Sequence, residues 1–396
     1  MNKMNALIVG SINKMTASLI PEMLYRAQFN VDLLLLSQSY KKSKYVNQVY
    51  CANNFPELID LAAKVVQDSR YDLIVIGDDE ALREIHHSSL PTDLKFKLLP
   101  VLSITDFKHL HSKVGLSEVL SKSSLETPEY CVVNSENELW DSVEKFGYPS
   151  LLKIDFSLGG KGVFECNGIK DAQCHKERLS YPLLIQRRIE GEAVDLSGFY
   201  QKGELIYFTY SNYEKIIGGQ FGTSAVRTFT QLGYVEKAIF EELQLLGRAL
   251  GADGFVNILS ILSPLDGRRY YIEADMRPNI WFDHGRVVGN DIATSINQFF
   301  TNGAVLSYPQ PKNPAYLKTV LVPHISRLSA WEVLSNQYNC HRFIGGTSKM
   351  LWLTFCALVR PLMLWLYRQL AQLVPGDGLL SIRTMYYRLI TLNGRL

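Results

Sequence analysis

Three mainly apolar runs near the N-terminus constrain the fold more than any other feature of the chain. They are Ala6–Gly10 (ALIVG), Val31–Leu36 (VDLLLL) and Asp72–Ile76 (DLIVI). Runs of this kind, without alternating polar residues, are typical of strands that are buried on both faces of a parallel sheet. Two stretches with helical spacing, Ser11–Tyr25 and Pro56–Val66, separate the runs. The alternation predicts a parallel α/β domain in about the first 100 residues.

The turns that follow these strands give no sign of a dinucleotide-binding site. The first turn contains only Gly10, so the GxGxxG fingerprint of dinucleotide-binding sites is missing. Asp78, Asp79 and Glu80 follow the third run, at the edge where open α/β sheets bind ligands. Two interpretations of these acids stay open: a ligand site, or a helix N-cap with favourable dipole charges.

The charge balance excludes a dedicated nucleic-acid binder. The 396 residues include 41 Lys and Arg against 39 Asp and Glu, a net charge of +2, whereas nucleic-acid-binding domains carry a clear basic excess. The six cysteines show no CxxC spacing, so we expect reduced and mostly buried thiols rather than a zinc or redox site. The first residues, MNKMNALIVGS, turn polar too quickly for a signal peptide, and we expect a cytoplasmic protein.

The middle of the chain continues with both strands and helices. The helices expected from periodicity are Thr105–Ser121 and Val235–Leu250. The expected strands are Tyr148–Ile154, Leu183–Gln186, Leu205–Tyr210, Phe255–Leu262 and Arg269–Ala274, of which the last two form a hairpin.

A glycine-rich loop follows the strand that contains Lys153. Residues 157–163 read SLGGKGV. Gly159, Gly160 and Gly162 let the backbone approach a ligand and point N–H groups at phosphate oxygens, and Lys153 and Lys161 add positive charge. The loop predicts a phosphate site, although a glycine-rich turn alone also fits an ordinary connection.

A second motif joins a strand to a polar hinge. Residues 182–192 read PLLIQRRIEGE. The backbone of such a hinge can hydrogen-bond a planar base while its acids reach a ribose. Alone, the segment also fits a strand followed by a turn.

A third motif places two acids on one strand. In YYIEADMRPN, Glu273 and Asp275 alternate, so both carboxylates face the same side of the strand. Two oxygen ligands with Arg277 close behind suit a magnesium ion that bridges phosphates. Taken alone, the acids also fit an exposed strand face.

Together and in this order, the motifs resemble those of the ATP-grasp superfamily, in particular its carboxylate–amine ligases. The resemblance extends from about Thr105 to Phe300 and includes HSKVGLSEVLSKSSLETPEY, residues 111–130, which resembles the lysine-bearing helix of the family. It implies an α/β protein with an ATP-grasp fold, preceded by a Rossmann-like parallel α/β domain and followed by a mostly helical tail. The expected domains are 1–100 (pre-ATP-grasp), 101–305 (nucleotide-binding) and 306–396 (C-terminal region).

The resemblance also implies a nucleotide site. Lys113 and Lys153 would contact the phosphates of ATP, and a mobile lid would cover them. The lid would consist of Gly159, Gly160, Lys161 and Gly162. The hinge contacts would come from Gln186, Arg187, Ile189 and Glu192, with Glu192 on the ribose.

The remaining implied roles concern the metal and the reaction. Glu273 and Asp275 would hold Mg²⁺, with Mn²⁺ as an alternative. Arg277 and Lys153 would act catalytically, by stabilising the transferred phosphoryl group or an acyl phosphate. Small-molecule carboxylate and amine substrates are the expected partners.

Three positions depart from the family pattern. Asp275 stands where the family has asparagine, and Arg187 follows the hinge glutamine where an acid is common. Leu259 stands where a further metal-binding residue is expected, and leucine cannot bind a metal, so either Asn257 substitutes or the second metal site is weak or absent. A non-catalytic ATP-binding or membrane-associated scaffold therefore stays an alternative to the ligase, as does an ATP-dependent kinase or carboxylase on the same fold.

Two residues outside these motifs have two interpretations each. Arg227 lies in a polar loop and either binds a carboxylate or is a solvated surface residue. His284 follows Trp281 and is either a substrate contact or a structural residue packed on aromatic rings.

The C-terminal tail is basic and apolar. From residue 341 onward, seven basic residues accompany a single acid, Asp377. Arg360 and Pro361 interrupt its apolar stretch, which disfavours a membrane-spanning helix. Two interpretations stay open: residues 348–396 bind an anionic membrane surface at the inner face of the membrane, or they form helices packed on the body or on a second subunit of a homodimer.

Overall fold

The computed structural model describes residues 3–13, 15–36, 43–67, 70–308 and 310–343. Contacts divide the chain into two compact units, Met1–Val320 and Leu321–Leu396. The tail predicted over 348–396 lies outside the described residues. No helix within the described ranges combines the length and the apolar character that crossing a membrane requires.

The three apolar runs form neighbouring strands of a parallel sheet, as predicted. The strand order is β3-β2-β1-β4, and each pair of neighbours runs parallel. The strands are β1 (Met4–Ser11), β2 (Phe29–Leu36), β3 (Gln48–Cys51) and β4 (Leu73–Ile76). The accompanying helices are a π-helical turn (Met15–Leu19), α1 (Ile20–Arg26), α2 (Phe55–Gln67), α3 (Asp79–His87) and α4 (Thr92–Leu98).

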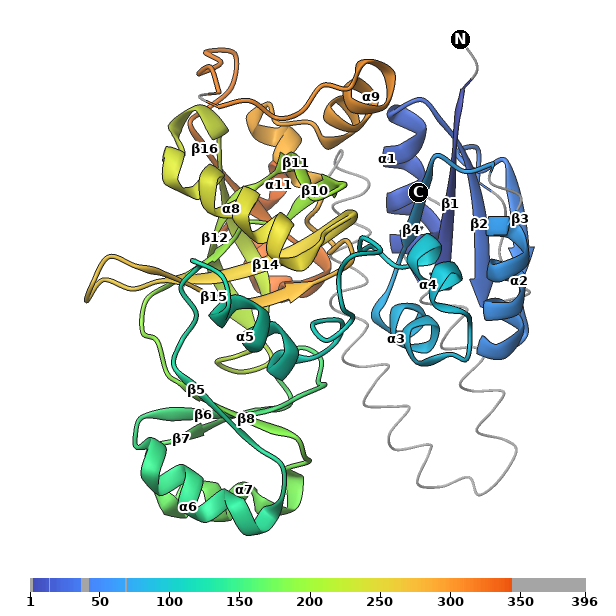
Figure 1. Cartoon of the computed structure of the whole chain (residues 1–396). Coiled ribbons are helices and arrows are strands. Elements are labelled where there is room, and N and C mark those ends of the chain that lie inside the picture. Colours follow the sequence, from blue (N-terminus) through green and yellow to red (C-terminus); the bar gives the residue numbers. More distant parts are fainter. Residues whose placement is uncertain (1–2, 14, 37–42, 68–69, 309, 344–396) are drawn as a thin grey trace, which may run out of the picture. The chain divides into compact units, whose positions relative to one another are not determined.

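Burial on both faces of this sheet explains the mainly apolar runs. Ala6 and Ile8 belong to the core cluster that contains residues of α1, while Leu7 and Val9 belong to the cluster that contains residues of α2. Figure 1 shows α1 and α2 on opposite sides of the sheet. Because successive side chains of a strand point to opposite faces, a strand covered on both sides favours apolar residues at successive positions. Asp32 of β2 is the exception, and its buried carboxylate accepts hydrogen bonds from Asn47, Gln48 N and Tyr71.

Two antiparallel sheets follow, one of them small. Its order is β5-β8-β6-β7, and α6 and α7 lie together along it (Figure 1). Its elements are β5 (Tyr130–Val133), α6 (Glu136–Phe146), β6 (Ser150–Ile154), β7 (Val163–Cys166), α7 (Ile169–His175), a 3-10 turn (Lys176–Arg178) and β8 (Leu183–Arg187).

The larger antiparallel sheet carries the predicted hairpin. Its strands include the series β11-β10-β14-β9-β12-β13, and β15 pairs with β14. They are β9 (Glu192–Asp195), β10 (Gly198–Gln201), β11 (Glu204–Phe208), β12 (Tyr210–Ile217), β13 (Thr223–Thr230), β14 (Gly254–Leu262) and β15 (Arg269–Asp275). The helical segments are two 3-10 turns (Leu232–Tyr234 and His284–Val288), α8 (Lys237–Leu250), which ends at the left-handed Gly251 as predicted, and α9 (Ile292–Asn302), which Asp291 caps.

Helix α5 (Lys113–Ser121) begins eight residues later than the periodicity predicted. The Ser112 side chain caps it by accepting from the N–H of Gly115 at 2.8 Å. The preceding segment folds back over this first turn, because a Cβ atom at Gly115 would lie 1.8 Å from the carbonyl oxygen of Lys108. Glycine at this position therefore permits a close backbone crossing that periodicity does not reveal.

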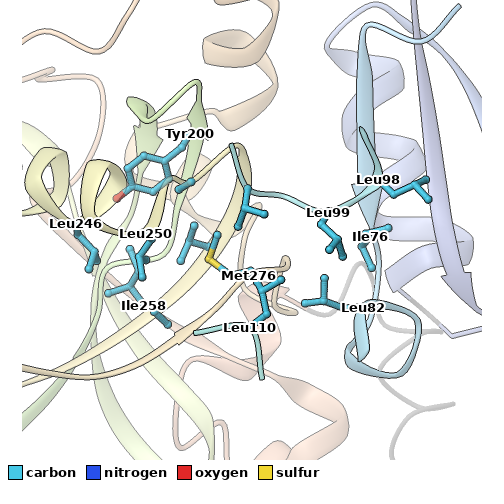
Figure 2. Packing of buried hydrophobic residues seen from close by; sticks show 14 of the residues in the cluster. Ile76, Leu82, Leu98, Leu99, Leu110, Tyr200, Leu246, Leu250, Ile258 and Met276 are labelled. Atoms are coloured by element: carbon cyan, nitrogen blue, oxygen red, sulfur yellow. The ribbon is translucent and has the colours of Figure 1, made fainter. Parts of the chain in front are cut away.

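One of the buried apolar clusters of the first unit extends from the parallel sheet to the larger antiparallel sheet. Leu82, Leu98 and Leu99 belong to the same buried cluster as Leu110 and Met276. Figure 2 shows the side chains of this cluster in a row, from Ile76 and Leu98 at the parallel sheet to Tyr200 and Ile258 in the larger sheet and Leu246 on α8. This packing fixes α3 next to the C-terminal end of β15. The domain boundaries near residues 100 and 305 stay predictions.

The second unit contributes few described elements. Strand β16 (Thr319–Pro323) runs into it, followed by a 3-10 turn (Ile325–Arg327), α10 (Ala330–Leu334) and α11 (Cys340–Phe343). Its described core is centred on Val333 and Cys340.

The five described cysteines form no disulfide with one another. Cys166 and Cys340 are buried, whereas Cys51 and Cys174 are exposed. The prediction that most thiols are buried is therefore wrong for this part of the chain. The exposed pair comes from a short strand at the edge of its sheet and from the last turn of a surface helix, where one side faces solvent.

Candidate active site

Lys113 stands at the first turn of α5 and faces the loop after β6. The Asp155 carboxylate anchors this turn, because its Oδ1 accepts from Ser112 Oγ at 2.8 Å and from Val114 N at 2.9 Å. Lys113 Nζ lies 3.2 Å from Ser157 Oγ and 3.3 Å from the carbonyl oxygen of Asp155. Burial lowers the pKa of Lys113, and the carboxylates of Glu273 and Asp275 oppose this effect.

Lys153 is a buried ammonium group on β6. Its Nζ donates to Gln186 Oε1 at 2.5 Å. Leu151 pairs with Gln186 across β6 and β8, so Lys153, two residues on, projects from the same face as this glutamine. Burial, reinforced by the positive charge of Lys113, lowers the pKa of Lys153 to about 8. The two lysine side chains are thus close enough for the charge of one to lower the pKa of the other.

Two glycines of the loop adopt a backbone conformation that favours glycine, and two pack closely against other residues. Gly159 and Gly160 adopt φ values of +59° and +75°, in the left-handed region. A Cβ atom at Gly160 would lie 1.9 Å from the carbonyl oxygen of Phe221, and one at Gly162 would lie 2.4 Å from the Ser157 side chain. The loop therefore needs glycine both for its turn and for its contact with the segment after β12. Lys161, between these positions, is exposed.

The hinge side chains contact other parts of the protein. Arg187 donates to Glu129 at 3.0 Å, and its guanidinium lies over the Phe146 ring at 5.1 Å. The exposed Glu192 accepts from Asn212 at 3.2 Å, and Ile189 is partly buried. Because the Arg187 charge is paired with Glu129, base recognition here would depend on backbone groups.

Glu273 and Asp275 project from the same side of β15, as predicted. Across the hairpin, Asp275 pairs with Asn257 and Glu273 pairs with Leu259. The Asp275 charge and burial raise the pKa of Glu273 to about 7. Burial also raises the pKa of Asp275, against the effects of Arg277 and of the Asn257 amide at 3.2 Å.

Both acids border a narrow cavity of about 40 Å³. Lys113, Ser157 and Asp79 also line this cavity. The walls thus combine a lysine at a helix N-terminus, a hydroxyl from the glycine loop and four carboxylates, of which the fourth belongs to Asp155.

Asp79 is a site residue that the sequence pattern did not assign to this cavity. The acids after β4 were expected either to cap a helix or to line a ligand site, and Asp78 and Asp79 do one each. Asp78 caps α3 by accepting from Ala81 N at 2.9 Å. Asp79, the next residue, accepts from Arg277 Nε at 2.5 Å, while Arg277 also donates to Asp275 at 3.3 Å. Burial of the guanidinium lowers the pKa of Arg277, but the nearby carboxylates of Asp275 and Asp79 outweigh this effect and raise the pKa above its usual value.

A buried polar network supports the acid pair from behind. Asn279 donates to Asn257 Oδ1 at 2.6 Å and to Asp195 at 3.3 Å. Arg227 forms an ion pair with Asp195 at 2.9 Å and is only 3% exposed. The surface interpretation of Arg227 is therefore wrong, because an internal carboxylate compensates its charge. The His284 ring packs against Trp281, as its structural interpretation requires.

The donor set fits a magnesium ion that takes ligands from a nucleotide. No group of three or more His, Cys, Asp or Glu side chains in the described ranges could hold a metal ion on its own. Glu273 and Asp275 are nevertheless two close carboxylates with raised pKa values, which a divalent cation would stabilise in the charged form. Magnesium sites of this kind commonly combine one or two carboxylates with phosphate and water oxygens.

Comparison with solved structures identifies the fold. Over 86% of this chain and 87% of the other, the structure matches N5-carboxyaminoimidazole synthetase from Staphylococcus aureus, solved with ADP, with a TM-score of 0.63 at 15% identity. The chain has the ATP-grasp fold. Further ATP-grasp matches are an L-amino acid ligase from Bacillus licheniformis (TM-score 0.54, 15% identity, 76% and 75% of the chains) and the biotin carboxylase domain of 2-oxoglutarate carboxylase from Hydrogenobacter thermophilus (TM-score 0.58, 14% identity, 78% and 72%).

Sequence comparison finds curated relatives that match a smaller part of the chain. The chain is 24% identical over 181 residues to the C-terminal section of the carbamoyl phosphate synthase large chain of Methanopyrus kandleri. The match covers 43% of this chain and 33% of that protein, so the chain spans about a third of this relative's length. No family model matches the sequence.

The ATP-grasp fold brings the sequence-predicted residues together from three elements. Lys153 and Gln186 come from the small sheet, Glu273 and Asp275 from the larger sheet, and Lys113 from α5, which contacts β15 and β8. The hinge side chains of Arg187 and Glu192 instead bind other side chains of the same protein, Glu129 and Asn212. The sequence offered one signal for Asp79, the run of three acids after β4, but no indication that Arg277 is its partner.

Proposed function

We propose that this chain is an ATP- and magnesium-dependent ligase that activates a carboxylate as an acyl phosphate for attack by an amine. The observation that carries the proposal is the opposition of two desolvated lysines, Lys113 and Lys153, to the paired carboxylates of Glu273 and Asp275. Each set of like charges is destabilised as it stands, and a magnesium–nucleotide complex would neutralise both.

The reaction proceeds in two balanced steps. A carboxylate oxygen of the substrate attacks the γ-phosphorus of ATP, and the bond from that phosphorus to ADP breaks. The amine nitrogen then attacks the acyl carbon, the bond from that carbon to phosphate oxygen breaks, and the nitrogen loses a proton. The products are an amide, ADP and phosphate.

The chain's own residues neutralise charge and align these steps. Lys113, Lys153 and the N–H groups of the glycine loop bind phosphate oxygens, and backbone groups around Gln186 and Ile189 hold the base. Contacts with described residues account for three of the five N–H donors of Arg277, so two are left for the transferred phosphoryl group. Glu273 and Asp275 hold Mg²⁺, or alternatively Mn²⁺, which supplies further neutralisation of the phosphates when bound.

Several comparisons support this proposal at the level of the fold. The matched structures include an L-amino acid ligase and enzymes solved with ADP or with MgADP and bicarbonate. A carboxylase on the same fold is therefore a second candidate. A cytoplasmic location, a homodimer and contact of residues 348–396 with an anionic membrane stay predictions.

A non-catalytic nucleotide-binding protein is the remaining candidate. The pairing of Leu259 with Glu273 favours it, because β14 adds no further carboxylate beside the acid pair. Substrate-dependent ADP release separates an enzyme from a scaffold. Hydroxylamine separates a ligase from a kinase, since it converts an acyl phosphate to a hydroxamate. A ligase gives ADP and hydroxamate together, and the complete absence of both over a broad set of carboxylates and amines would contradict the proposal.

A further inference from the structure

A second, larger cavity adjoins the one beside the acid pair. Its volume is about 370 Å³, at the lower end of the range of small-molecule sites. It lies between α3 and the segment before α5, and four residues line both cavities: His111, Ser112, Asp155 and Phe156. A ligand in the larger cavity would therefore reach the space next to Lys113, Glu273 and Asp275.

The walls of the larger cavity combine apolar surface with positive charge. Phe107, Leu110 and Phe156 supply the apolar part, and Arg83 and Lys108 supply cationic groups. Leu110 belongs to the buried apolar cluster of Figure 2, together with Leu82 of α3. The one acid in the lining, Asp155, already accepts hydrogen bonds at the N-terminus of α5.

Arg83 is positioned for an anion at the junction of the two cavities. Its guanidinium lies 4.9 Å from the Phe156 ring, and Phe156 borders both spaces. Within the described part of the chain, Arg83 has no hydrogen bond or ion pair with another residue. The N–H groups of its guanidinium therefore stay available to donate two parallel hydrogen bonds to a carboxylate.

His111 faces the same ring from the other side of the junction. Its ring meets Phe156 edge-on at 5.6 Å, and its buried Nε2 atom has no hydrogen-bond partner among the described residues. Its backbone is left-handed, with φ at +58°, a conformation that is uncommon for residues other than glycine. Strained residues with unused polar atoms are concentrated at binding sites.

We infer that the larger cavity binds a small organic carboxylate with an apolar or aromatic body. Arg83 and His111 hold its carboxylate at the junction, and Phe107 and Leu110 contact its body. The inference rests on the proposed function, since this carboxylate would be the group that is phosphorylated.

The test uses two probes, 3-phenylpropionate and hexanoate, with 3-phenylpropanamide as the uncharged control. Binding is measured by ligand-detected NMR and calorimetry on the full chain, with and without MgATP. Arg83→Gln removes the proposed anion contact. Arg178→Gln is the matched control, because Arg178 is also an exposed arginine over a phenylalanine ring, Phe164, at 4.5 Å.

We expect Arg83→Gln to weaken carboxylate binding by about tenfold or more, as expected for loss of a charge-assisted contact. Arg178→Gln and the amide probe should show no such change, and MgATP affinity should stay the same in both variants. His111→Asn, which suits a left-handed backbone, should also weaken the carboxylate probes. MgATP binding without binding of either carboxylate, or equal effects of Arg83→Gln and Arg178→Gln, would overturn this inference alone. Absence of MgATP binding would instead contradict the proposed function.

Discussion

The guanidinium of Arg277 donates from Nε to the Asp79 carboxylate at 2.5 Å, which joins the end of β15 to the first residue of α3. The two side chains are 17% and 16% exposed and 198 residues apart in sequence. The same guanidinium contacts Asp275. An acid at the start of α3, just after the last strand of the N-terminal parallel sheet, therefore positions the arginine that we assign to the transferred phosphoryl group.

Asp79→Asn should lower stability and turnover together. Removal of one partner from a largely buried ion pair leaves the other charge without compensation, so we expect a loss of about 1–3 kcal/mol in the free energy of unfolding. Turnover should fall more than nucleotide affinity, because Arg277 loses its orientation. Urea unfolding and ADP-release kinetics measure both effects. Glu241→Gln, which breaks the exposed pair with Lys237, is the control and should change stability by less than about 1 kcal/mol.

Lys153→Met should separate nucleotide binding from folding. The variant removes a buried ammonium group and its repulsion from Lys113, which offsets the loss of the hydrogen bond to Gln186. We therefore expect a change of less than about 2 kcal/mol in the free energy of unfolding. Nucleotide affinity should fall by about tenfold or more, since a desolvated phosphate partner is lost. Lys145→Met, on the exposed end of α6, serves as the control; equal nucleotide affinity in the two variants would refute the role of Lys153.

Glu273→Gln should make the protein without bound ligand more stable above pH 7. The unfolded chain releases this proton near pH 4.5, whereas the folded chain holds it to about pH 7. The folded state binds more protons in this interval, so the stability of the wild type falls as pH rises from about 4.5 to about 7. Above pH 7 the variant should be more stable by on the order of 2–3 kcal/mol, and the difference should vanish below pH 4.5. Urea unfolding at several pH values measures this, and parallel curves for the two proteins would contradict it.

The affinity for MgATP should pass through a maximum between about pH 7 and pH 8. Below pH 7 a proton occupies Glu273 and competes with the metal, and above pH 8 Lys153 loses the charge that binds phosphate. Calorimetry in buffers of different ionisation enthalpy should also detect proton release on binding near pH 7. An affinity that is constant from pH 6 to pH 9 would rule out both assignments.

The fold could be predicted where one residue pattern determines one element. The apolar runs identified β1, β2 and β4, because burial on both faces favours apolar side chains along the whole strand. Strand β3 was missed, since it is a short edge strand whose residues are partly exposed. The period of two along β15 correctly placed Glu273 and Asp275 on one side.

The rest of the site depends on contacts between distant segments. Gln186 meets Lys153 only because β8 lies between β5 and β6, an order that the local sequence does not determine. The pairing of Arg187 with Glu129 and that of Arg277 with Asp79 depend in the same way on tertiary packing. Sequence periodicity also could not place the start of α5, which follows from the cap at Ser112 and the backbone crossing at Gly115.

Calorimetric titration with ATP tests the central claim most directly, with and without Mg²⁺, on the wild type and on Glu273→Gln. The account predicts that tight binding to the wild type requires Mg²⁺ and that the substitution weakens it by about tenfold or more, as expected when a charged metal ligand is lost. Absence of ATP binding in both conditions, or equal affinity of the two proteins for MgATP, would contradict the account.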